Sequence, residues 1–445
     1  MGLLALSPAS AVNAQVSGPA CPAQPLRWME DCRALAKGRG HGLDRLRYVP
    51  LDRAGGRWIS FGAEHRVRVE AFDEPDFGVG GAPDYTSAAQ RALLHADLRG
   101  PERLRLFVQL SAVDEQGREP GPRPFDVSGV DAAQAFVDLP LGPLSVRLGR
   151  QETTLGGNRL VGLRDGATLR RAFDGVKADA PLVGGVLTGF SFRPVRNAGG
   201  AFDDEADSSD AFAGLTWDRR EANGAEYGVF YFDRRRDRAT YAAAVGKDRR
   251  HTFGLRYARR AGAWDAYGQG AIQLGELADR DVRAWGVTAE VGRTLDAPAR
   301  PRLGVAGGLA SGDDDRSDDQ VATFDPLYPN LGVFSSAPLY YPANQVNLGV
   351  NVSARVNRAT LTAGAVVLAR YAAADAIYSN PGRPLAEPPG DDRLSAVLLE
   401  ITGAVPLTAR VELNGSVVRA EALDAVTAAG GRDALFGVLQ LTTRF

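Results

Sequence analysis

Apolar and polar residues alternate along most of the chain. In the first such stretch, residues 58–72, Phe61 and Val69 fall on one face, whereas Glu64 and Arg66 fall on the other. A period of two residues is that of a β-strand with one apolar and one polar face. The pattern recurs often enough to predict about eighteen strands of roughly ten residues, the length that a tilted strand needs to cross a bilayer. The predicted strands are 58–72, 90–99, 104–112, 131–139, 144–151, 172–180, 186–194, 210–218, 226–233, 250–259, 264–275, 282–293, 301–311, 344–354, 359–370, 393–404, 408–419 and 433–445.

Long and short connections follow these strands in alternation. Short periplasmic turns, long extracellular loops and two periplasmic termini are the plan of bacterial outer-membrane barrels. Lipid cannot satisfy the hydrogen bonds of a free strand edge, so the first and last strands must pair. Long connections are predicted at 73–89, 113–130, 152–171, 195–209, 234–249, 312–343, 371–392 and 420–432, a weakly long one at 276–281, and short ones at 100–103, 140–143, 260–263 and 406–407.

The last strand places Leu439, Leu441 and Phe445 on one face. A terminal aromatic residue on an alternating strand favours an outer-membrane barrel, and a buried last strand of a soluble protein is the alternative. We therefore predict an all-β, transmembrane antiparallel barrel over residues 58–445, in the outer membrane of a Gram-negative cell.

Residues 1–57 precede this barrel and are predicted to be a signal-like and periplasmic segment. The start, MGLLALSPASAVNAQ, resembles the end of a secretory signal that is cleaved before Gln15, and an uncleaved terminus is the alternative. One short helix is predicted over 25–37. Cys21 and Cys32 are the only cysteines, and in an oxidising periplasm they would form a disulfide, whereas in cytosol they would stay thiols.

Composition narrows the function of the 445-residue chain. Its net charge of -2 excludes a generally basic nucleic-acid binder, and no apolar run is long enough for a membrane helix. The four histidines stand in no catalytic or metal-ligand spacing, and no nucleophile or phosphate-loop motif is present, so we expect neither an enzyme nor a cofactor. The acidic run with Asp313, Asp314 and Asp315 could hold calcium, but we favour a solvated outer loop because it lacks the spacing of a known site.

The densest charge lies in residues 147–177, which hold six arginines against three acidic residues around a glycine-rich loop. Guanidinium is a permanently charged, planar fork that fits carboxylate or phosphate. An anion site and a solvated loop are both compatible with this stretch taken alone. The arginines are Arg147, Arg150, Arg159, Arg164, Arg170 and Arg171.

Short motifs along residues 45–445 together resemble the alginate export family of outer-membrane proteins. They are Gly62-x-Glu64-x-Arg66, Arg91-x-Leu93-Leu94 with Asp97-Leu98, Gln134-Ala135-Phe136-Val137-Asp138, Gly149-Arg150-Gln151-Glu152, Gly156 with Arg159-Leu160, Arg164-Asp165-Gly166, Arg170-Arg171, Phe173-Asp174-Gly175, Ala310-Ser311-Gly312-Asp313 and Thr323-Phe324-x-Pro326-Leu327-Tyr328-Pro329. The resemblance implies an eighteen-strand barrel that exports an anionic polyuronate through an arginine-lined lumen.

The alternation also predicts which charged residues face the lumen, where rings of basic side chains select anions. For any one arginine, a structural ion pair is the alternative. The predicted substrate-binding residues are Glu64, Arg66, Arg68, Arg91, Arg99, Arg105, Asp138, Arg147, Arg150, Arg159, Arg170 and Arg171. Other predicted lumen residues are Lys177, Arg193, Arg256, Arg370 and Arg410, and the acidic Glu70, Asp97, Asp265, Glu290, Glu400 and Glu412.

Two functions remain open. The first is a monomeric pore for passive export of an anionic polysaccharide, which a periplasmic secretion partner could deliver to the pore. The alternative is an anion-selective porin for uptake of small anionic solutes or oligosaccharides. Arg234, Arg235 and Arg236 are expected to face lipopolysaccharide phosphates or water. Because the inner turns are short, any plug must come from the outer loops or from residues 1–57.

Overall fold

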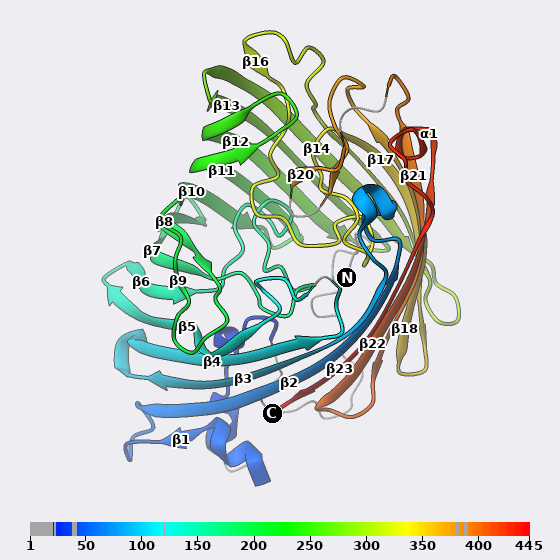
Figure 1. Ribbon diagram of the computed structural model, residues 1–445. Coiled ribbons are helices and arrows are strands. Elements are labelled where there is room, and N and C mark those ends of the chain that lie inside the picture. The colour runs from blue at the N-terminus through cyan, green and yellow to red at the C-terminus, as the bar shows by residue number, and fades with distance from the viewer. Residues whose placement is uncertain (1–20, 22–23, 38–41, 120, 380–381, 387–389) are drawn as a thin grey trace.

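A closed antiparallel barrel of eighteen strands forms the body of the protein (Figure 1). The computed structural model describes residues 21, 24–37, 42–119, 121–379, 382–386 and 390–445. Sequence neighbours pair around the barrel, and β2 closes it on β23, from Glu64 opposite Arg444 to Asp73 opposite Leu435. The predicted barrel is confirmed. Its strands are β2 (Trp58–Asp73), β3 (Tyr85–Arg99), β4 (Arg105–Gln116), β5 (Ser128–Leu141), β6 (Leu144–Gln151), β7 (Phe173–Leu182), β8 (Gly185–Arg196), β10 (Asp210–Arg220), β11 (Ala225–Thr240), β12 (Val245–Ala261), β13 (Trp264–Leu277), β14 (Arg280–Thr294), β15 (Arg302–Ala310), β17 (Gln345–Val356), β18 (Ala359–Arg370), β21 (Leu394–Pro406), β22 (Val411–Ala422) and β23 (Ala434–Arg444).

Short strands and helices lie outside the eighteen strands of the barrel. They are the strands β1 (Val49–Pro50), β9 (Glu205–Ala206), β16 (Gln320–Val321), β19 (Tyr378–Ser379) and β20 (Arg383–Pro384), the helix α1 (Asp424–Ala428), and the 3-10 helices η1 (Arg27–Met29), η2 (Arg33–Lys37), η3 (Gly42–Arg47), η4 (Pro75–Gly81) and η5 (Pro101–Arg103). Where one helix was predicted over 25–37, η1 and η2 stand apart, because the backbone of Glu30 is extended after η1. The signal-like residues 1–15 lie outside the described residues.

Most of the long loops lie at the extracellular end, and the short turns lie at the end that carries the C-terminus (Figure 1). Several outer connections are shorter than predicted, two of them by enough to become tight turns. The long loop expected over 234–249 is a tight connection of residues 241–244, because β11 and β12 stay paired out to Thr240 opposite Val245. Likewise, β13 and β14 pair to Leu277 opposite Arg280, so only residues 278–279 remain of the connection expected over 276–281.

The longer pairing of β11 with β12 also places Arg234, Arg235 and Arg236 on a strand and not in a loop. Arg234 and Arg236 are held inside the barrel, where both make ion pairs with Asp325, and only Arg235 is exposed. The expectation that the whole triplet faces lipopolysaccharide or water was therefore wrong. The three arginines continue a β-strand, in which alternate side chains point to the same face. Arg234 and Arg236 therefore both point inward.

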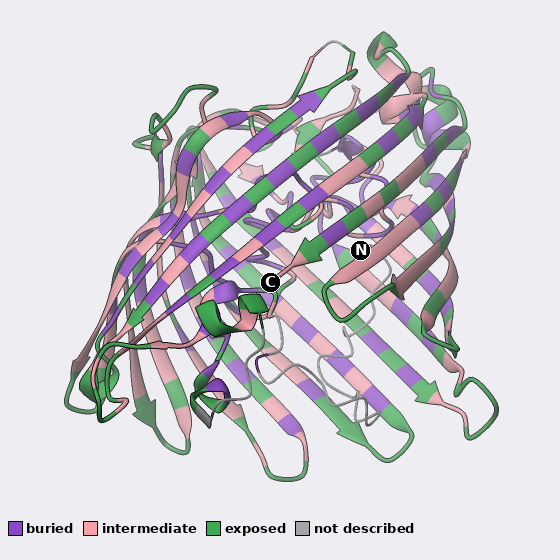
Figure 2. Ribbon diagram, turned by 90° about the horizontal axis from the view of Figure 1, so that it is seen from below, coloured by how far each residue is buried: buried purple, intermediate pink, exposed green. Residues whose placement is uncertain are grey.

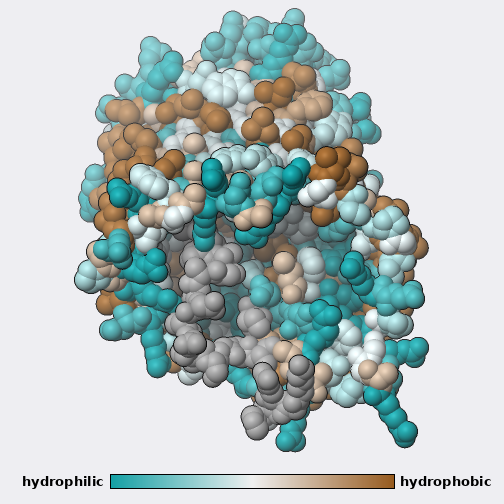
Figure 3. All heavy atoms as spheres, turned by 180° about the vertical axis from the view of Figure 1, so that it is seen from behind, coloured by the Kyte–Doolittle hydropathy of each residue, from teal (hydrophilic) through white to brown (hydrophobic). Residues whose placement is uncertain are grey.

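The two faces of the barrel wall differ in polarity. Along the strands, buried and exposed residues alternate (Figure 2). The outward positions include Leu94, which is 60% exposed, and Ile401, which is 66% exposed, whereas inward Glu64 and Arg66 are buried. Hydrophobic residues gather in a band on the outer surface, with hydrophilic residues above it (Figure 3). An apolar exterior of this extent is suited to lipid. Among the described residues, no helix is long and apolar enough to cross a membrane.

Two outer connections fold into the barrel rather than away from it. We call residues 152–172 the constriction loop and residues 311–344 the facing loop. Their backbones meet where the Gly162 amide donates to the Tyr328 carbonyl at 2.9 Å and the Tyr328 amide donates to the Leu160 carbonyl at 2.8 Å. Both loops pack on a buried aromatic cluster that includes Phe173 and Phe212. Burial of apolar side chains therefore holds these two loops inside the lumen, and the loops narrow the lumen.

Candidate functional site: the charged lumen wall

A row of charged residues crosses five neighbouring strands in the periplasmic half of the lumen. Arg99 on β3 lies opposite Arg105 on β4, which lies opposite Asp138 on β5. The row continues through Arg147 on β6 to Lys177 on β7. Directly paired residues on antiparallel strands place their Cβ atoms ~4.5–5.5 Å apart. Cross-strand register therefore gathers the four cations, which we call the basic row.

Carboxylates between the cations neutralise most of this charge. Asp97 accepts hydrogen bonds from the Nε and Nη2 of Arg105, at 2.7 and 2.8 Å, and also pairs with Arg99 at 2.9 Å. The Nε and Nη2 of Arg147 donate hydrogen bonds to the carboxylate of Asp138, at 2.6 and 2.8 Å. Lys177 pairs with Asp179 at 2.8 Å. Four cations against three carboxylates leave the row with one net positive charge.

Two aromatic rings lie against the guanidinium of Arg147. Its guanidinium carbon lies 3.9 Å from the ring centre of Trp28 and 3.8 Å from that of Phe136. The two rings stand at 87° to each other, and both add cation–π attraction to the ion pair of Arg147 with Asp138. Arg147 is thus fixed in position, with its Nε and Nη2 edge committed to a carboxylate.

The middle of the lumen holds a second group, on β2 and β3. Glu64 pairs with both Arg91 and Arg444. Arg66 donates three hydrogen bonds to backbone carbonyls of the constriction loop, at 2.5, 3.1 and 3.2 Å, and Arg91 donates a fourth at 3.1 Å. These two arginines therefore tie the constriction loop to the barrel wall.

The other predicted arginines are distributed around the lumen. Arg171 donates to the carbonyls of Tyr328 and Pro329 on the facing loop, and burial lowers the pKa of Arg171 to about 10. The remaining ion pairs are Arg68 with Glu70 at 2.5 Å, Arg150 with Asp174 at 2.8 Å, Arg159 with Glu290 at 3.3 Å and Arg170 with Asp165 at 2.7 Å.

Taken together, the predicted site residues form an ion-paired wall instead of a set of free cations. Among the described residues, Arg66 and Arg171 are the members of the predicted arginine set whose guanidinium has no carboxylate partner. A charge that is buried without a partner is costly, which explains why carboxylates accompany the others.

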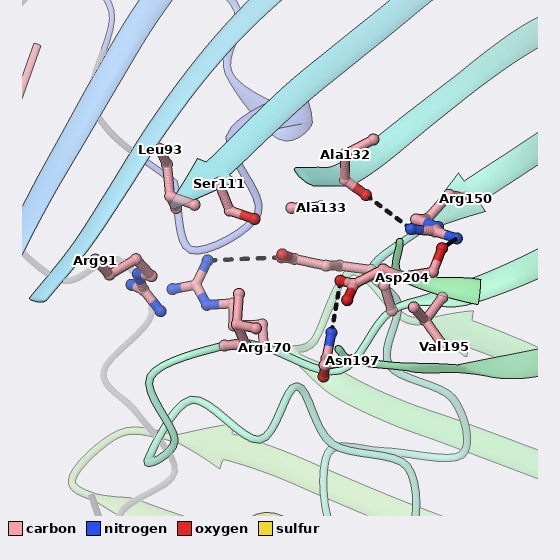
Figure 4. A pocket seen from close by; sticks show the side chains of 13 residues that line it. Arg91, Leu93, Ser111, Ala132, Ala133, Arg150, Arg170, Val195, Asn197 and Asp204 are labelled. Atoms are coloured by element: carbon pink, nitrogen blue, oxygen red, sulfur yellow. Dashed lines mark hydrogen bonds and ion pairs between the residues drawn. The ribbon is translucent and has the colours of Figure 1, made fainter. Parts of the chain in front are cut away.

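A small cavity lies beside Arg91 and the constriction loop (Figure 4). Its lining residues include Arg91, Arg150, Glu152, Arg170 and Asp204, and its volume of ≈ 10 Å³ has room for about one water molecule. Glu152 is 3% exposed, and its Oε2 has no hydrogen-bond partner, although Arg170 Nη1 lies 3.7 Å away. Burial raises the pKa of Glu152 to about 7, against the lowering effect of Arg170 and Arg91.

Glu152 was not in the predicted site set, and neither was Trp28. Glu152 directly follows Arg150 and Gln151 at the end of β6, so its place within the arginine-rich stretch was the available signal. For Trp28 the sequence offered no signal, because its neighbours in space come from strands that begin more than fifty residues later.

Two predicted lumen residues lie elsewhere. Arg193 is exposed and donates to the carbonyls of Asp207 and Ser208, because Phe190 and Phe192 take the inward parity on β8. Arg410 lies in a periplasmic turn, where it pairs with Asp44 at 2.8 Å. Lys177, Arg256 and Arg370 face inward, as do the acidic residues Glu70, Asp97, Asp265, Glu290, Glu400 and Glu412.

Possible metal ligands gather in two places within the described part of the chain. One group contains Cys21 and Cys32, which form a disulfide. The other, Asp131, Asp203 and Asp204, accepts hydrogen bonds from backbone amides of its own loop. The residues of the acidic run differ in their surroundings. Asp313 is buried and accepts hydrogen bonds from the backbone amides of Asp315 and Ala322, whereas Asp314 is exposed.

The apolar exterior, closed barrel and charged lumen define an outer-membrane pore of the Gram-negative type. The family model for alginate export matches residues 57–436, so the chain belongs to the alginate export family. No curated protein matches its sequence.

Solved structures of Pseudomonas aeruginosa pores share the fold. OccK5 (OpdH) superposes with a TM-score of 0.60 at 11% identity, covering 87% of this chain and 98% of its own. OccD3 (OpdP) gives 0.60 at 12% identity, with 90% and 93% covered. OccK2 (OpdF), solved in complex with glucuronate, gives 0.58 at 14% identity, with 87% and 98% covered.

Proposed function

We propose that this protein is a passive pore that exports an anionic polysaccharide of the polyuronate type, with no catalytic step. The observation that carries the proposal is the basic row, in which register alone brings Arg99, Arg105, Arg147 and Lys177 side by side at the periplasmic half of the lumen. Membership of the alginate export family supports the choice of a polyuronate.

The pairing within the row is suited to transport because two of its carboxylates are each shared by two cations. Asp97 serves both Arg99 and Arg105, and Asp138 lies 3.9 Å from Arg105 as well as against Arg147. A uronate carboxylate that enters the row competes with these aspartates for the same guanidinium forks. The resident aspartates keep each contact weak enough to release, which conduction requires.

A second candidate function is uptake of small anions, and the narrow lumen favours it. The constriction loop and the facing loop lie in the lumen and meet there, where the Gly162 amide donates to the Tyr328 carbonyl at 2.9 Å. In addition, the structurally similar OccK2 was solved with the monosaccharide glucuronate.

Current block in planar bilayers tests the first proposal. Oligouronates added on the periplasmic side should block the current, whereas neutral glucose oligomers of equal length should not. The variant with Arg99, Arg105 and Arg147 replaced by glutamine should need at least about tenfold more oligouronate, since the loss of even one hydrogen bond to a charged group costs ~1.5–3 kcal/mol and about 1.4 kcal/mol is tenfold. The matched control is Arg220→Gln, because Arg220 is 78% exposed at the periplasmic end of β10.

The outcomes separate the two functions. If oligouronates leave the current unchanged while glucuronate enters liposomes that contain the protein, uptake of small anions replaces polysaccharide export. A cation-selective pore would contradict both.

A further inference from the structure

An N-terminal segment of the chain lies inside the periplasmic mouth of the barrel. It comprises residues 24–32, and we call it the mouth segment. Drawn in blue with η1 and η2, the N-terminal segment lies at the lower end of the barrel in Figure 1, below the loops that enter from the opposite end. Its contacts reach three parts of the protein that are far apart in sequence.

The first contact is with the basic row. The Trp28 carbonyl accepts a hydrogen bond from Arg105 at 2.5 Å, and the Glu30 carbonyl accepts one from Arg99 at 2.9 Å. The Trp28 ring covers the guanidinium of Arg147. The mouth segment therefore contacts three of the four cations of the row, and it presents oxygen atoms where an anionic ligand would.

The second and third contacts are with the constriction loop and the barrel seam. Arg170 of the constriction loop donates to the Pro25 carbonyl at 2.5 Å. Arg27 donates to the Phe445 carbonyl at 2.8 Å, beside the pairing of β2 with β23. The mouth segment thus bridges the β3–β6 wall, the constriction loop and the seam.

A compact cross-linked unit holds the mouth segment in shape. Glu30 is buried and pairs with Arg27 at 3.0 Å and with Arg47 at 2.8 Å. Arg47 also donates to the Cys21 carbonyl at 2.6 Å, and the disulfide from Cys21 to Cys32 closes the loop. Such a cross-link restricts the number of conformations open to a displaced segment, and so favours the docked one.

We propose that the mouth segment is a periplasmic plug that occupies the basic row at rest, and that anions pass when it is displaced. This inference rests on the pore function proposed above. Because the plug and a uronate use the same donors on Arg99 and Arg105, binding of the two is mutually exclusive there. Neutral carbonyls are weaker acceptors than carboxylates, so an anionic chain can replace them.

Single-channel recording in symmetrical potassium chloride tests the plug. Trp28→Ala removes the cover of Arg147, and Cys21→Ser with Cys32→Ser removes the cross-link. Both are expected to raise the open probability about tenfold over the unmodified protein. Met29→Ala is the matched control, since Met29 is adjacent to Trp28 but 55% exposed.

Two further measurements guard against misfolded variants. Heat-modifiable migration shows whether each variant forms the barrel, and a reductant applied to the unmodified protein should reproduce the effect of the cysteine replacements. Alkylation without reductant should find neither thiol in the unmodified protein. Equal, full conductance of the unmodified protein and of both folded variants overturns the plug while leaving the pore intact. Absence of current in every variant overturns the pore itself.

Discussion

Glu152 is expected to make the ion preference of the pore depend on pH. Its carboxyl group is 3% exposed beside the small cavity, with one oxygen lacking a hydrogen-bond partner and Arg170 Nη1 at 3.7 Å. Burial raises the pKa of Glu152 to about 7. The group is therefore neutral below about pH 7 and negative above it. As the pH rises, the constriction gains one negative charge, and the preference for anions should fall.

The size of the effect follows from Coulomb's law. For an ion that passes at a distance on the order of 10 Å, one charge contributes about 0.4 kcal/mol at a dielectric constant of 80 and about 1.7 kcal/mol at 20. Because the charge repels an anion and attracts a cation by the same energy, the ratio of anion to cation permeability changes by roughly fourfold at the first value and roughly 270-fold at the second. The ratio at pH 9 should be lower than that at pH 5 by a factor between these limits.

Reversal potentials in a salt gradient, recorded from pH 5 to pH 9, measure this ratio. Glu152→Gln keeps the shape of the side chain but cannot ionise, so it should hold the low-pH ratio throughout. The difference between the two proteins cancels the contributions of all other groups. Parallel profiles for the unmodified protein and the variant would refute the reasoning.

Three other outcomes are expected. Asp138→Asn leaves Arg147 without its carboxylate and should raise anion selectivity, and an unchanged reversal potential would count against the basic row. Arg66→Ala removes three hydrogen bonds from a charged donor, each worth ~1.5–3 kcal/mol. The constriction loop should therefore become sensitive to protease, and the current through the pore should become noisier. A loop that resists protease as before would show that Arg66 does not hold it. The purified protein should show heat-modifiable migration and a nearly pure β circular dichroism spectrum in detergent, and a soluble, folded state without detergent is incompatible with the apolar exterior.

The alternation of polarity was a reliable guide to the barrel because it is a local property of each strand. Ranges such as 144–151 and 359–370 match β6 and β18 residue for residue. Polarity misled where it was taken as a sign of loops: the arginine-rich stretch from 234 continues β11, since a polar lumen accepts charged residues on the inward face.

The same local reasoning could place a side chain on the lumen face, but it could not assign its partner. Arg66 lies on the lumen face, as expected, but its partners there are carbonyls about one hundred residues further along the chain. The same holds for Arg147, whose neighbours are Trp28, Phe136 and Asp138. These partners depend on cross-strand register and on how the loops fold inward.

The sequence by itself therefore determined the class of fold, the number of strands and the charged character of the lumen, because a strand's side-chain period is set within the strand. Only the tertiary structure decided which charges are neutralised, where the constriction lies and that the mouth segment occupies the basic row. Those features arise from contacts such as Arg105 with Trp28, which are 77 residues apart. Such contacts exist only after the barrel has closed and its interior has been filled.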